Sequence, residues 1–371
     1  MAKIALLKNQ MRGRGGLEKQ TLLIAKALHE QGNDVSLLVD FCPLSVTLPS
    51  WLKVVTFSVP PLGKSLKTLS LVRQYDHWLK QHPQDLVLGL ERCSECSHYR
   101  AGNGVHAGYL AIRKPYRSHW RNALDAFSPH HRTILHLERK LYRSPNLKKV
   151  IVNSQFIADQ LAEFHDVSDE KIEVIHNGVD WFAYSEAFEN KWKNTPQHNC
   201  RRFLFAGNGF VRKGLEPLLK AFQLLRQGNW ELHIVGNDRH LRQFKQLTAE
   251  LSLDDRVTFH GEQPSVTPFY ASCDFLVIPS LYDPFANTTI EGLAMGLPII
   301  TTQYNGGKEV LNKRSGFITS HISPEALKEG LEWAMTLPLT DNYSRSIREG
   351  IKHCDINIQL PKLINTLLTD A

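Results

Sequence analysis

The segment Tyr282–Pro298, YDPFANTTIEGLAMGLP, decides how the rest of the chain is interpreted. It follows the apolar run Phe275–Ile278, and such a run is typical of a buried strand. Asn287 and Thr288 are residue types that cap helices, so a helix is expected to begin there, and its free N–H groups would form an anion pocket. The segment therefore predicts a strand, a turn and a helix, with a ligand crevice at the carboxyl end of the strand.

The same order of elements occurs twice in the chain. Near the N-terminus the apolar run Lys3–Leu7 precedes the glycine-rich sequence Arg12–Gly16 and a helical pattern. In the second half Arg202–Ala206 precedes Gly207–Gly214 and another helical pattern. A strand, a glycine loop and a helix are typical of the start of a doubly wound α/β domain, and 371 residues suffice for two such domains.

An Asn-Gly turn and the pattern-poor stretch Trp181–Asn199 mark the expected domain boundary. This places a first domain at residues 1–175 and a second domain at residues 176–350. The tail Ile351–Leu368 has the pattern of an amphipathic helix.

Asp283 and Glu291 carry the strongest functional signal, because seven residues separate them and a Gly-x-Pro sequence follows. This arrangement resembles the signature of family 4 of the retaining nucleotide-sugar glycosyltransferases, in which the first acid is usually Glu. The resemblance implies the α/β GT-B architecture, with two Rossmann-like domains facing across a cleft and a C-terminal helix, about residues 351–371, crossing back to the first domain. It also implies that Glu291 binds the ribose hydroxyls and Asp283 the hydroxyls of the transferred sugar.

Arg212 and Lys213 stand immediately before a predicted helix. A departing diphosphate needs positive charge, either from a divalent metal ion or from fixed cations at a helix start. No two Asp residues in the chain are separated by one residue, which is the spacing that metal-dependent transferases commonly use. The resemblance implies that Arg212 and Lys213 form a diphosphate clamp. We therefore expect a nucleotide-sugar substrate and neither a metal ion nor another cofactor.

Glycines and small polar residues follow several predicted strands of the second half, and the nucleotide is expected along that rim. Gly236 and Asn237 follow one strand, and the stretch from Gly261 to Val266 follows the next. We expect the base to lie against these two loops.

The segment Arg100–His106, RAGNGVH, is similar to a stretch beside the acceptor in lipopolysaccharide-core glycosyltransferases of the same family. The Asp of that pattern is replaced here by Asn103, which cannot accept a proton. If a side chain activates the acceptor, His106 is the candidate, with an unperturbed pKa suited to neutral pH; a structural histidine is the equal alternative. Gly15 and Gly16 would allow close approach of backbone to the acceptor.

The net charge of +7 is concentrated in Arg113–Lys149, which holds ten Lys or Arg residues and two acids. Aromatic residues among these cations favour an anionic membrane surface, where each cation adds about 1 kcal/mol. The alternative is a solvated helix face. No nucleic-acid motif accompanies the charge, so we expect no nucleic-acid partner. The sequence has no signal-peptide pattern and no apolar run of membrane-spanning length, so we expect a cytoplasmic protein that is peripheral on the inner face of the cytoplasmic membrane.

Cys93 and Cys96 alone among six scattered cysteines have metal or redox spacing. With His98 they would supply three zinc ligands, but a second pair at ligand spacing is missing from the sequence. Reduced loop thiols are therefore favoured over a metal site.

The residues and the resemblance together predict a hexosyltransferase that moves a hexose, specifically glucose from UDP-glucose, onto a lipopolysaccharide core sugar. One alternative is a transferase that builds another surface polysaccharide or a glycolipid. A nucleotide-sugar epimerase of the same fold and a sugar-nucleotide-binding protein without transfer activity are the others.

Overall fold

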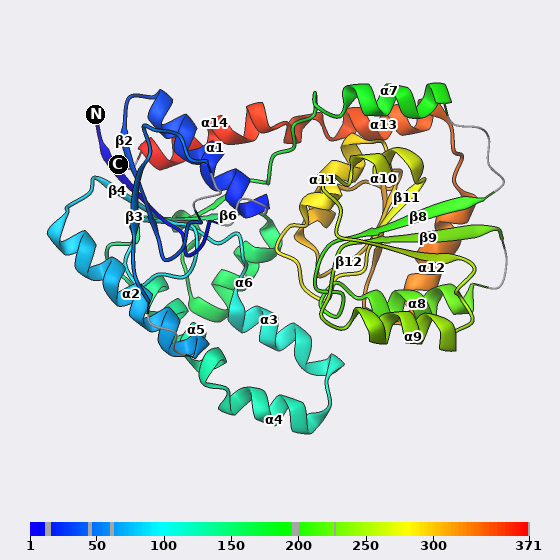
Figure 1. Ribbon diagram of the computed structural model, residues 1–371, viewed down its shortest axis with the longest axis horizontal. Helices are drawn as coiled ribbons and strands as arrows, with labels where there is room; N and C mark the ends of the chain where they lie inside the picture. Colours follow the sequence, from blue (N-terminus) through cyan, green and yellow to red (C-terminus); the bar gives the residue numbers. More distant parts are fainter. Residues whose placement is uncertain (12–15, 44–46, 60–62, 195–199, 226–227, 370–371) are drawn as a thin grey trace. The chain divides into compact units, whose positions relative to one another are not determined.

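Two separate parallel sheets form in the computed structural model, one in each of two units. Unit 1 comprises Met1–His176 and Leu360–Ala371, and unit 2 comprises Asn177–Gln359 (Figure 1). The structure describes residues 1–11, 16–43, 47–59, 63–194, 200–225 and 228–369.

Unit 1 is built on a seven-stranded sheet with the order β3-β2-β1-β4-β5-β6-β7, and all neighbouring strands are parallel. Its strands are β1 (Lys3–Leu7), β2 (Asp34–Val39), β3 (Lys53–Thr56), β4 (Leu86–Gly89), β5 (His98–Arg100), β6 (Lys149–Val152) and β7 (Ile172–Val174). Because β1 pairs with both β2 and β4, the direction of strand addition reverses between β1 and β4. Open α/β sheets bind ligands at this kind of switch point.

The helices of unit 1 connect the strands of this sheet. They are α1 (Gly16–Glu30), α2 (Lys64–Gln81), α3 (His106–Arg113), α4 (His119–Phe127), α5 (Pro129–Tyr142) and α6 (Gln155–His165), with 3₁₀ turns at Lys114–Tyr116 and Asp169–Lys171. Helix α4 differs from the others in burying none of its side chains. Ile24 and Leu28 of α1 share one buried cluster with Ile4 and Leu6 of β1. The buried side of α5 includes Ile134, Leu137 and Leu141.

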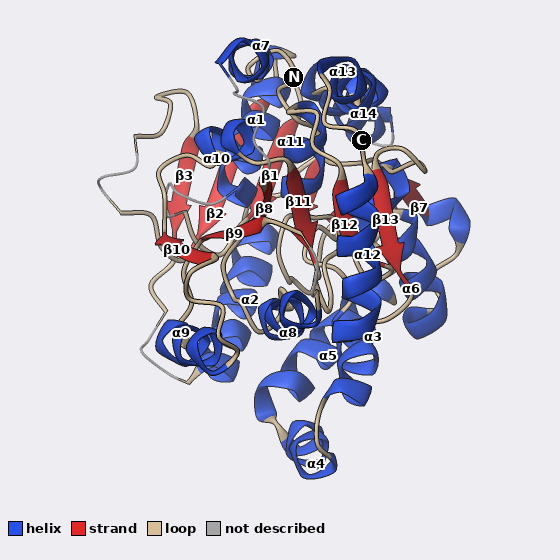
Figure 2. Cartoon of the chain, turned by 90° about the vertical axis from the view of Figure 1, so that its right-hand side faces the viewer, coloured by secondary structure: helices blue, strands red, loops and turns tan. Residues whose placement is uncertain are grey.

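Unit 2 repeats the arrangement with a six-stranded parallel sheet of order β10-β9-β8-β11-β12-β13 (Figure 2). Its strands are β8 (Arg201–Ala206), β9 (Trp230–Val235), β10 (Val257–Gly261), β11 (Phe275–Ile278), β12 (Ile299–Thr302) and β13 (Gly316–Thr319). The switch point lies between β8 and β11. The predicted clamp follows β8, and the segment Tyr282–Pro298 follows β11.

Helices cover both faces of the second sheet. They are α7 (Ser185–Asn194), α8 (Leu215–Leu224), α9 (Leu241–Glu250), α10 (Thr267–Ser272), α11 (Asn287–Ala294), α12 (Pro324–Thr336) and α13 (Asp341–Gly350), with 3₁₀ turns at Gly306–Val310 and Lys352–Cys354. Successive side chains of a strand point to opposite faces. Accordingly, Phe203 and Phe205 of β8 pack in one cluster with α8, α9 and α12, and Leu204 and Ala206 pack in the other with α10, α11 and α13.

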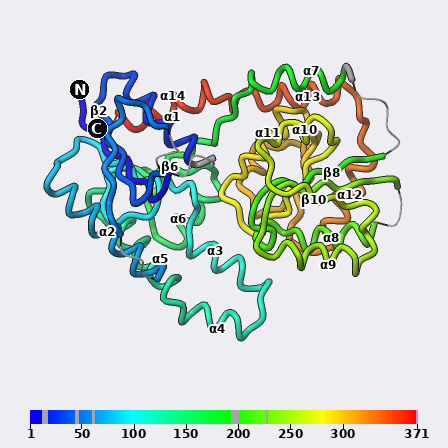
Figure 3. Tube along the Cα trace, viewed as in Figure 1, coloured from blue at the N-terminus to red at the C-terminus, as the bar shows by residue number. Residues whose placement is uncertain are grey.

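The last helix, α14 (Ile356–Thr369), begins in unit 2 and ends in the core of unit 1. Its residues Leu363, Ile364 and Leu367 join the same buried cluster as α1. Figure 3 shows this red segment beside the blue start of the chain. The C-terminal helix that the family resemblance implied is therefore present, although it starts at residue 356 after a 3₁₀ turn and not at residue 351.

Several sequence expectations need correction. The stretch Trp181–Asn199 has a regular element, α7, although the division between the units, His176 to Asn177, lies within one residue of the predicted boundary. The strands β5 and β13 were not predicted. Both are short, and β5 consists of buried His98, Tyr99 and Arg100, whose polar residues do not resemble a core strand.

Candidate active site

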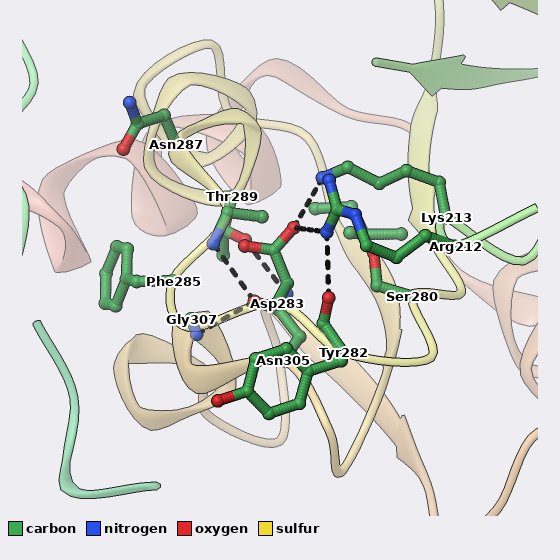
Figure 4. Close-up of polar contacts among 12 residues, drawn as sticks. Arg212, Lys213, Ser280, Tyr282, Asp283, Phe285, Asn287, Thr289, Asn305 and Gly307 are labelled. Atoms are coloured by element: carbon green, nitrogen blue, oxygen red, sulfur yellow. Dashed lines mark hydrogen bonds and ion pairs between the residues drawn. The ribbon is translucent and has the colours of Figure 1, made fainter. Parts of the chain in front are cut away.

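The loop after β8 carries Arg212 and Lys213 to the switch point of unit 2. Gly214, at the N-cap of α8, has a φ of 78°, and a Cβ there would lie 2.0 Å from the carbonyl oxygen of Pro279. Glycine is therefore required for the backbone after β8 to pack against the backbone after β11. This packing brings the two basic side chains to the loop that holds Asp283 (Figure 4).

Asp283 lies against both cations. Lys213 Nζ is 2.5 Å from Asp283 Oδ2, and Arg212 Nη1 is 3.4 Å from the same oxygen. Arg212 Nη1 also donates to the carbonyl oxygen of Tyr282 at 2.8 Å. Burial alone raises the pKa of Asp283, but Lys213 and then Arg212 lower it by more, so the net pKa lies below its ordinary value. The carboxylate is therefore ionised, and Lys213 is buried while the Arg212 side chain is 42% exposed.

The buried side chain of Asn305 organises the loop that carries Asp283. Its Oδ1 accepts from the backbone N–H groups of Ala286 at 3.1 Å and Gly307 at 3.0 Å. Its Nδ2 donates to the hydroxyls of Thr289 at 3.2 Å and Thr301 at 3.0 Å. One amide thus joins the start of α11, the end of β12 and the following 3₁₀ turn.

Backbone bonds then fix Asp283 to the same turn. Its N–H donates to Tyr304 at 2.9 Å, and its carbonyl oxygen accepts from Gly306 at 2.9 Å. The sequence placed Asn305 only on a glycine-rich rim, and no spacing pattern revealed its role, because its partners come from three separate elements.

The expectation that Asn287 and Thr288 cap α11 is wrong. The N-cap residue is Ala286, without a side-chain cap. Asn287 Oδ1 instead accepts from Asn177 Nδ2 at 2.7 Å. Thr288 Oγ1 is buried without a hydrogen-bond partner within the described chain. Asn305 accepts a hydrogen bond from the N–H of the N-cap residue Ala286.

Glu291 lies one turn inside α11, and its Oε2 accepts a hydrogen bond of 2.7 Å from the hydroxyl of Tyr270 on α10. The sequence did not indicate Tyr270, which is fully buried. From the sequence, an aromatic residue in a short helix is expected to be a core residue. Only the fold shows that its hydroxyl is hydrogen-bonded to Glu291.

The loops after β8, β9 and β10 are hydrogen-bonded to one another. Gly236 N–H donates to Gly261 at 2.8 Å, and Asn237 N–H donates to the side chain of Asn208 at 2.7 Å. A Cβ on Gly236, whose φ is 130°, would lie 2.2 Å from the carbonyl oxygen of Gly207. Val266 is the N-cap residue of α10. The structure thus brings the predicted base-binding residues to one edge of the unit 2 sheet.

In unit 1 the predicted acceptor segment is split between exposed and buried residues. Asn103 is exposed in the turn after β5, whereas His106 is buried at the start of α3. Gly16 is the first residue of α1, and Gly15 lies outside the described residues. At the switch point of this sheet Lys8, after β1, forms an ion pair with Glu91, after β4. An ion pair of the same kind thus joins corresponding strand ends in both units.

The premise that His106 has an unperturbed pKa is wrong. Burial, followed by the charges of Arg92 and His131, lowers its pKa to about 3. Its Nε2 lies 2.9 Å from Nδ1 of His131, and its backbone N–H donates to Glu138 at 2.8 Å. His106 is therefore neutral throughout the physiological pH range and is a weak base.

Two family models match nearly the whole chain between them. The model described as Glycosyltransferase Family 4 matches residues 14–181, and the model described as Glycosyl transferases group 1 matches residues 186–353. The chain belongs to the family 4, group 1 glycosyltransferases. It is a nucleotide-sugar-dependent hexosyltransferase with the GT-B fold, as the sequence predicted.

Individual relatives of this glycosyltransferase are distant. The lipopolysaccharide glucosyltransferase WaaG of Escherichia coli K12 is 24% identical over 338 residues, which cover 87% of this chain and 86% of the relative. An uncharacterized glycosyltransferase of Methanocaldococcus jannaschii is 24% identical over 216 residues, which cover 54% of this chain and 55% of the relative.

Solved structures agree with the fold of this glycosyltransferase over its whole length. A crystal structure of WaaG has a TM-score of 0.83 at 20% identity and covers 98% of this chain and 99% of that chain. Anabaena HepE in complex with UDP and glucose has a TM-score of 0.72 at 17% identity and covers both chains completely.

The basic region Arg113–Lys149 of this glycosyltransferase begins at the last residue of α3, contains α4 and α5, and ends at the first residue of β6. Asp125 of α4 pairs with Arg113 at 2.6 Å and with Arg117 at 2.5 Å. On the other side of α4 the large side chains are exposed: Trp120 by 61%, Leu124 by 61% and Phe127 by 78%. These three positions lie four and three residues apart and therefore share one helix face.

Cys93 and Cys96 of the glycosyltransferase are both buried and free. No group of three or more His, Cys, Asp or Glu residues in the described chain is arranged to hold a metal ion. Likewise, none of the described helices has the length and apolarity needed to cross a membrane.

Proposed function

We propose that this glycosyltransferase moves a hexose, specifically glucose from UDP-glucose, onto a sugar of a lipopolysaccharide core. The observation that carries the donor half is the contact of Arg212 and Lys213 with buried Asp283 at the switch point of unit 2. The relative WaaG, a lipopolysaccharide glucosyltransferase similar over 87% of this chain, supports the sugar and the acceptor. HepE, which was solved with UDP and glucose, supports the nucleotide.

The donor diphosphate would replace the Asp283 carboxylate on the two cations. Arg212 offers a planar fork of N–H groups to two phosphate oxygens, and Lys213 adds a point charge. Both stand at the start of α8, where the helix dipole also favours an anion. Charge that develops on the departing UDP is then stabilised by fixed cations, so the transfer needs no divalent metal.

Asp283, released from the cations, would accept hydrogen bonds from the hydroxyls of the transferred sugar. The base would lie against Gly236, Asn237 and the loop from Gly261 to Val266, and Glu291 would accept from the ribose hydroxyls. Each of these residues belongs to unit 2.

Unit 1 would bind the acceptor beside Gly16 and Asn103. Asn103 has no basic atom, and the pKa of His106 lies at about 3, so both are poor bases for a sugar hydroxyl. We therefore propose a front-face reaction with retention of configuration, in which the departing phosphate takes the proton of the acceptor hydroxyl. The C1–O bond to UDP breaks as the bond from C1 to the acceptor oxygen forms on the same face.

The exposed face of α4 is proposed to lie on the cytoplasmic surface of the inner membrane. Trp120, Leu124 and Phe127 would enter the interface, and the lysines and arginines of Arg113–Lys149 would bind anionic headgroups. The proposed acceptor, if linked to lipid, would lie at that surface.

A donor panel tests this function. Purified protein is incubated with UDP-glucose, UDP-galactose, ADP-heptose and GDP-mannose, each with and without a truncated lipopolysaccharide core, and products are identified by mass spectrometry. Transfer from UDP-glucose only when the core is present supports the proposal. Conversion of the UDP-sugar without an acceptor indicates an epimerase, transfer only to another glycolipid indicates a different acceptor class, and UDP binding without any product indicates a binding protein.

A further inference from the structure

The hydrogen bond between Tyr270 and Glu291 joins a fully buried hydroxyl to the carboxylate that we assign to the ribose. Tyr270 is 0% exposed, and its hydroxyl lies 2.7 Å from Glu291 Oε2. The two residues come from different helices, α10 and α11, and nothing local in the sequence couples them.

Tyr270 is a permanent donor in this contact. Burial raises its pKa, and the negative charge of Glu291 raises it further. The phenol therefore keeps its proton over the working pH range, and Glu291 must be the acceptor. A hydrogen bond between a neutral donor and a carboxylate is stronger than one between neutral groups, and it restricts the rotation of a side chain with three torsions.

The helix that carries Tyr270 is itself held by a buried ammonium group. Lys191 of α7 donates to the carbonyl oxygen of Cys273 at 2.6 Å and to that of Tyr270 at 3.4 Å, at the carboxyl end of α10. Lys191 is buried, and burial lowers its pKa to about 8. A positive charge at the end of a helix stabilises the helix dipole, so Lys191 fixes the position from which Tyr270 reaches Glu291.

We propose that Tyr270 is a positioning residue that orients Glu291 so that its carboxylate selects donors with an intact ribose diol. A carboxylate distinguishes a ribose diol from a deoxyribose only if its oxygens are held in place. A carboxylate that rotates freely forms hydrogen bonds with water in place of the missing hydroxyl. The proposal rests on the proposed function, in which Glu291 binds the ribose.

Isothermal titration calorimetry with UDP, 2′-deoxy-UDP and 3′-deoxy-UDP tests the proposal on the whole chain. Wild type is expected to bind UDP more tightly than at least one deoxy analogue. Tyr270→Phe should weaken UDP binding about fivefold, since it removes the bond that orients a charged acceptor. Tyr270→Phe should not change the affinity for the deoxy analogue that wild type binds less tightly than UDP. The selectivity, which is the ratio of the two dissociation constants, should therefore fall by the same factor. If Tyr270→Phe only disturbed packing, it would weaken the binding of UDP and of the deoxy analogues equally.

Three controls make the result specific. Tyr343→Phe removes a phenol that donates to the carbonyl oxygen of Arg314 in the same unit, and it should leave the selectivity unchanged. In a Glu291→Ala background the Tyr270→Phe change should have no further effect. Lys191→Met, which frees the end of α10, should lower the same selectivity if Tyr270→Phe does not fold.

The outcomes separate this proposal from the proposed function. Wild type that does not bind UDP, or binds the three nucleotides equally, overturns the donor assignment and the role of Glu291. Wild type that discriminates, with the same selectivity in Tyr270→Phe and Lys191→Met, overturns the role of Tyr270 alone.

Discussion

Asp283 Oδ2 and Lys213 Nζ lie 2.5 Å apart in a buried ion pair at the switch point of unit 2. The Asp283 carboxylate pairs with the cation that we assign to the donor diphosphate. Donor binding would therefore exchange one anion for another on Lys213, and the buried ammonium group of Lys213 would have a countercharge before and after binding. Removing one partner of a buried pair is costly because it leaves the other charge desolvated.

Asp283→Asn is the first prediction. The unliganded protein should lose about 2 kcal/mol of unfolding free energy, because Lys213 loses its countercharge. UDP should bind more tightly, since the diphosphate no longer competes with a carboxylate, while transfer falls. Thermal unfolding with and without UDP measures both effects. Glu189→Gln removes a partly exposed pair with Arg345 and serves as the control. Weaker UDP binding by Asp283→Asn would contradict the exchange.

The clamp itself gives the second prediction. Arg212→Ala and Lys213→Ala should each lower kcat by about 100-fold, the usual cost of removing one group that stabilises a developing anion. Arg212→Lys should recover only part of the rate, because it keeps the charge and loses the fork. Lys220→Ala, on the exposed side of α8, is the matched control. Unchanged rates in both alanine variants would eliminate the clamp.

The lowered pKa of His106 predicts how stability depends on pH. A histidine whose pKa is depressed in the folded state binds fewer protons there than when unfolded, so stability is lost as pH falls below the unfolded value of about 6.5. Urea unfolding between pH 7.5 and pH 5 should show this loss, and His106→Asn should reduce its slope. His321→Asn, at an exposed site, should not. The rate of transfer should show no titration of His106 near neutrality.

Membrane binding through α4 is the fourth prediction. Replacing Trp120 and Phe127 by Ser should lower partitioning onto anionic vesicles by at least tenfold, because each large side chain contributes about 2 kcal/mol when buried. Transfer to a soluble core fragment should continue. Leu66→Ser alters another exposed apolar side chain, at 57% exposure, and should leave vesicle binding unchanged. Equal binding of all variants would remove α4 from the interface.

Metal independence is the fifth prediction. Transfer in the presence of EDTA should fall by less than about twofold, since fixed cations at a helix start supply the charge that a bound ion supplies elsewhere. The assay compares EDTA-treated protein with protein supplied with Mn²⁺ or Mg²⁺. Strict reliance on either ion would contradict the clamp mechanism.

The sequence predicted strands that can be recognised from the pattern of their own residues. The strands at Lys3–Leu7 and Phe275–Ile278 have the predicted bounds, because each is a short and mostly apolar run. The edge strand β13 was missed, since four residues that begin with glycine give no periodic signal.

Features that depend on tertiary contacts could not be predicted from the sequence. The lowered pKa of His106 results first from burial and then from Arg92 and His131, which are brought to it from other parts of the chain. Asn305 gained its role only through partners on α11 and β12, and Tyr270 only through Glu291. By contrast, the clamp could be proposed from the sequence, because Arg212 and Lys213 are adjacent and only Gly214 separates them from a helix.

Unit 1 takes Leu363, Ile364 and Leu367 of α14 into its core, and the ribosome makes these residues after every residue of unit 2. The order of synthesis therefore differs from the order in which the cores are completed. Unit 2 has its full set of core residues while the nascent first unit still lacks one packed helix, so an apolar groove beside α1 stays open until α14 has been made. A chain that stopped before α14 would keep the core of unit 2 intact and leave unit 1 as a target for chaperones and proteases.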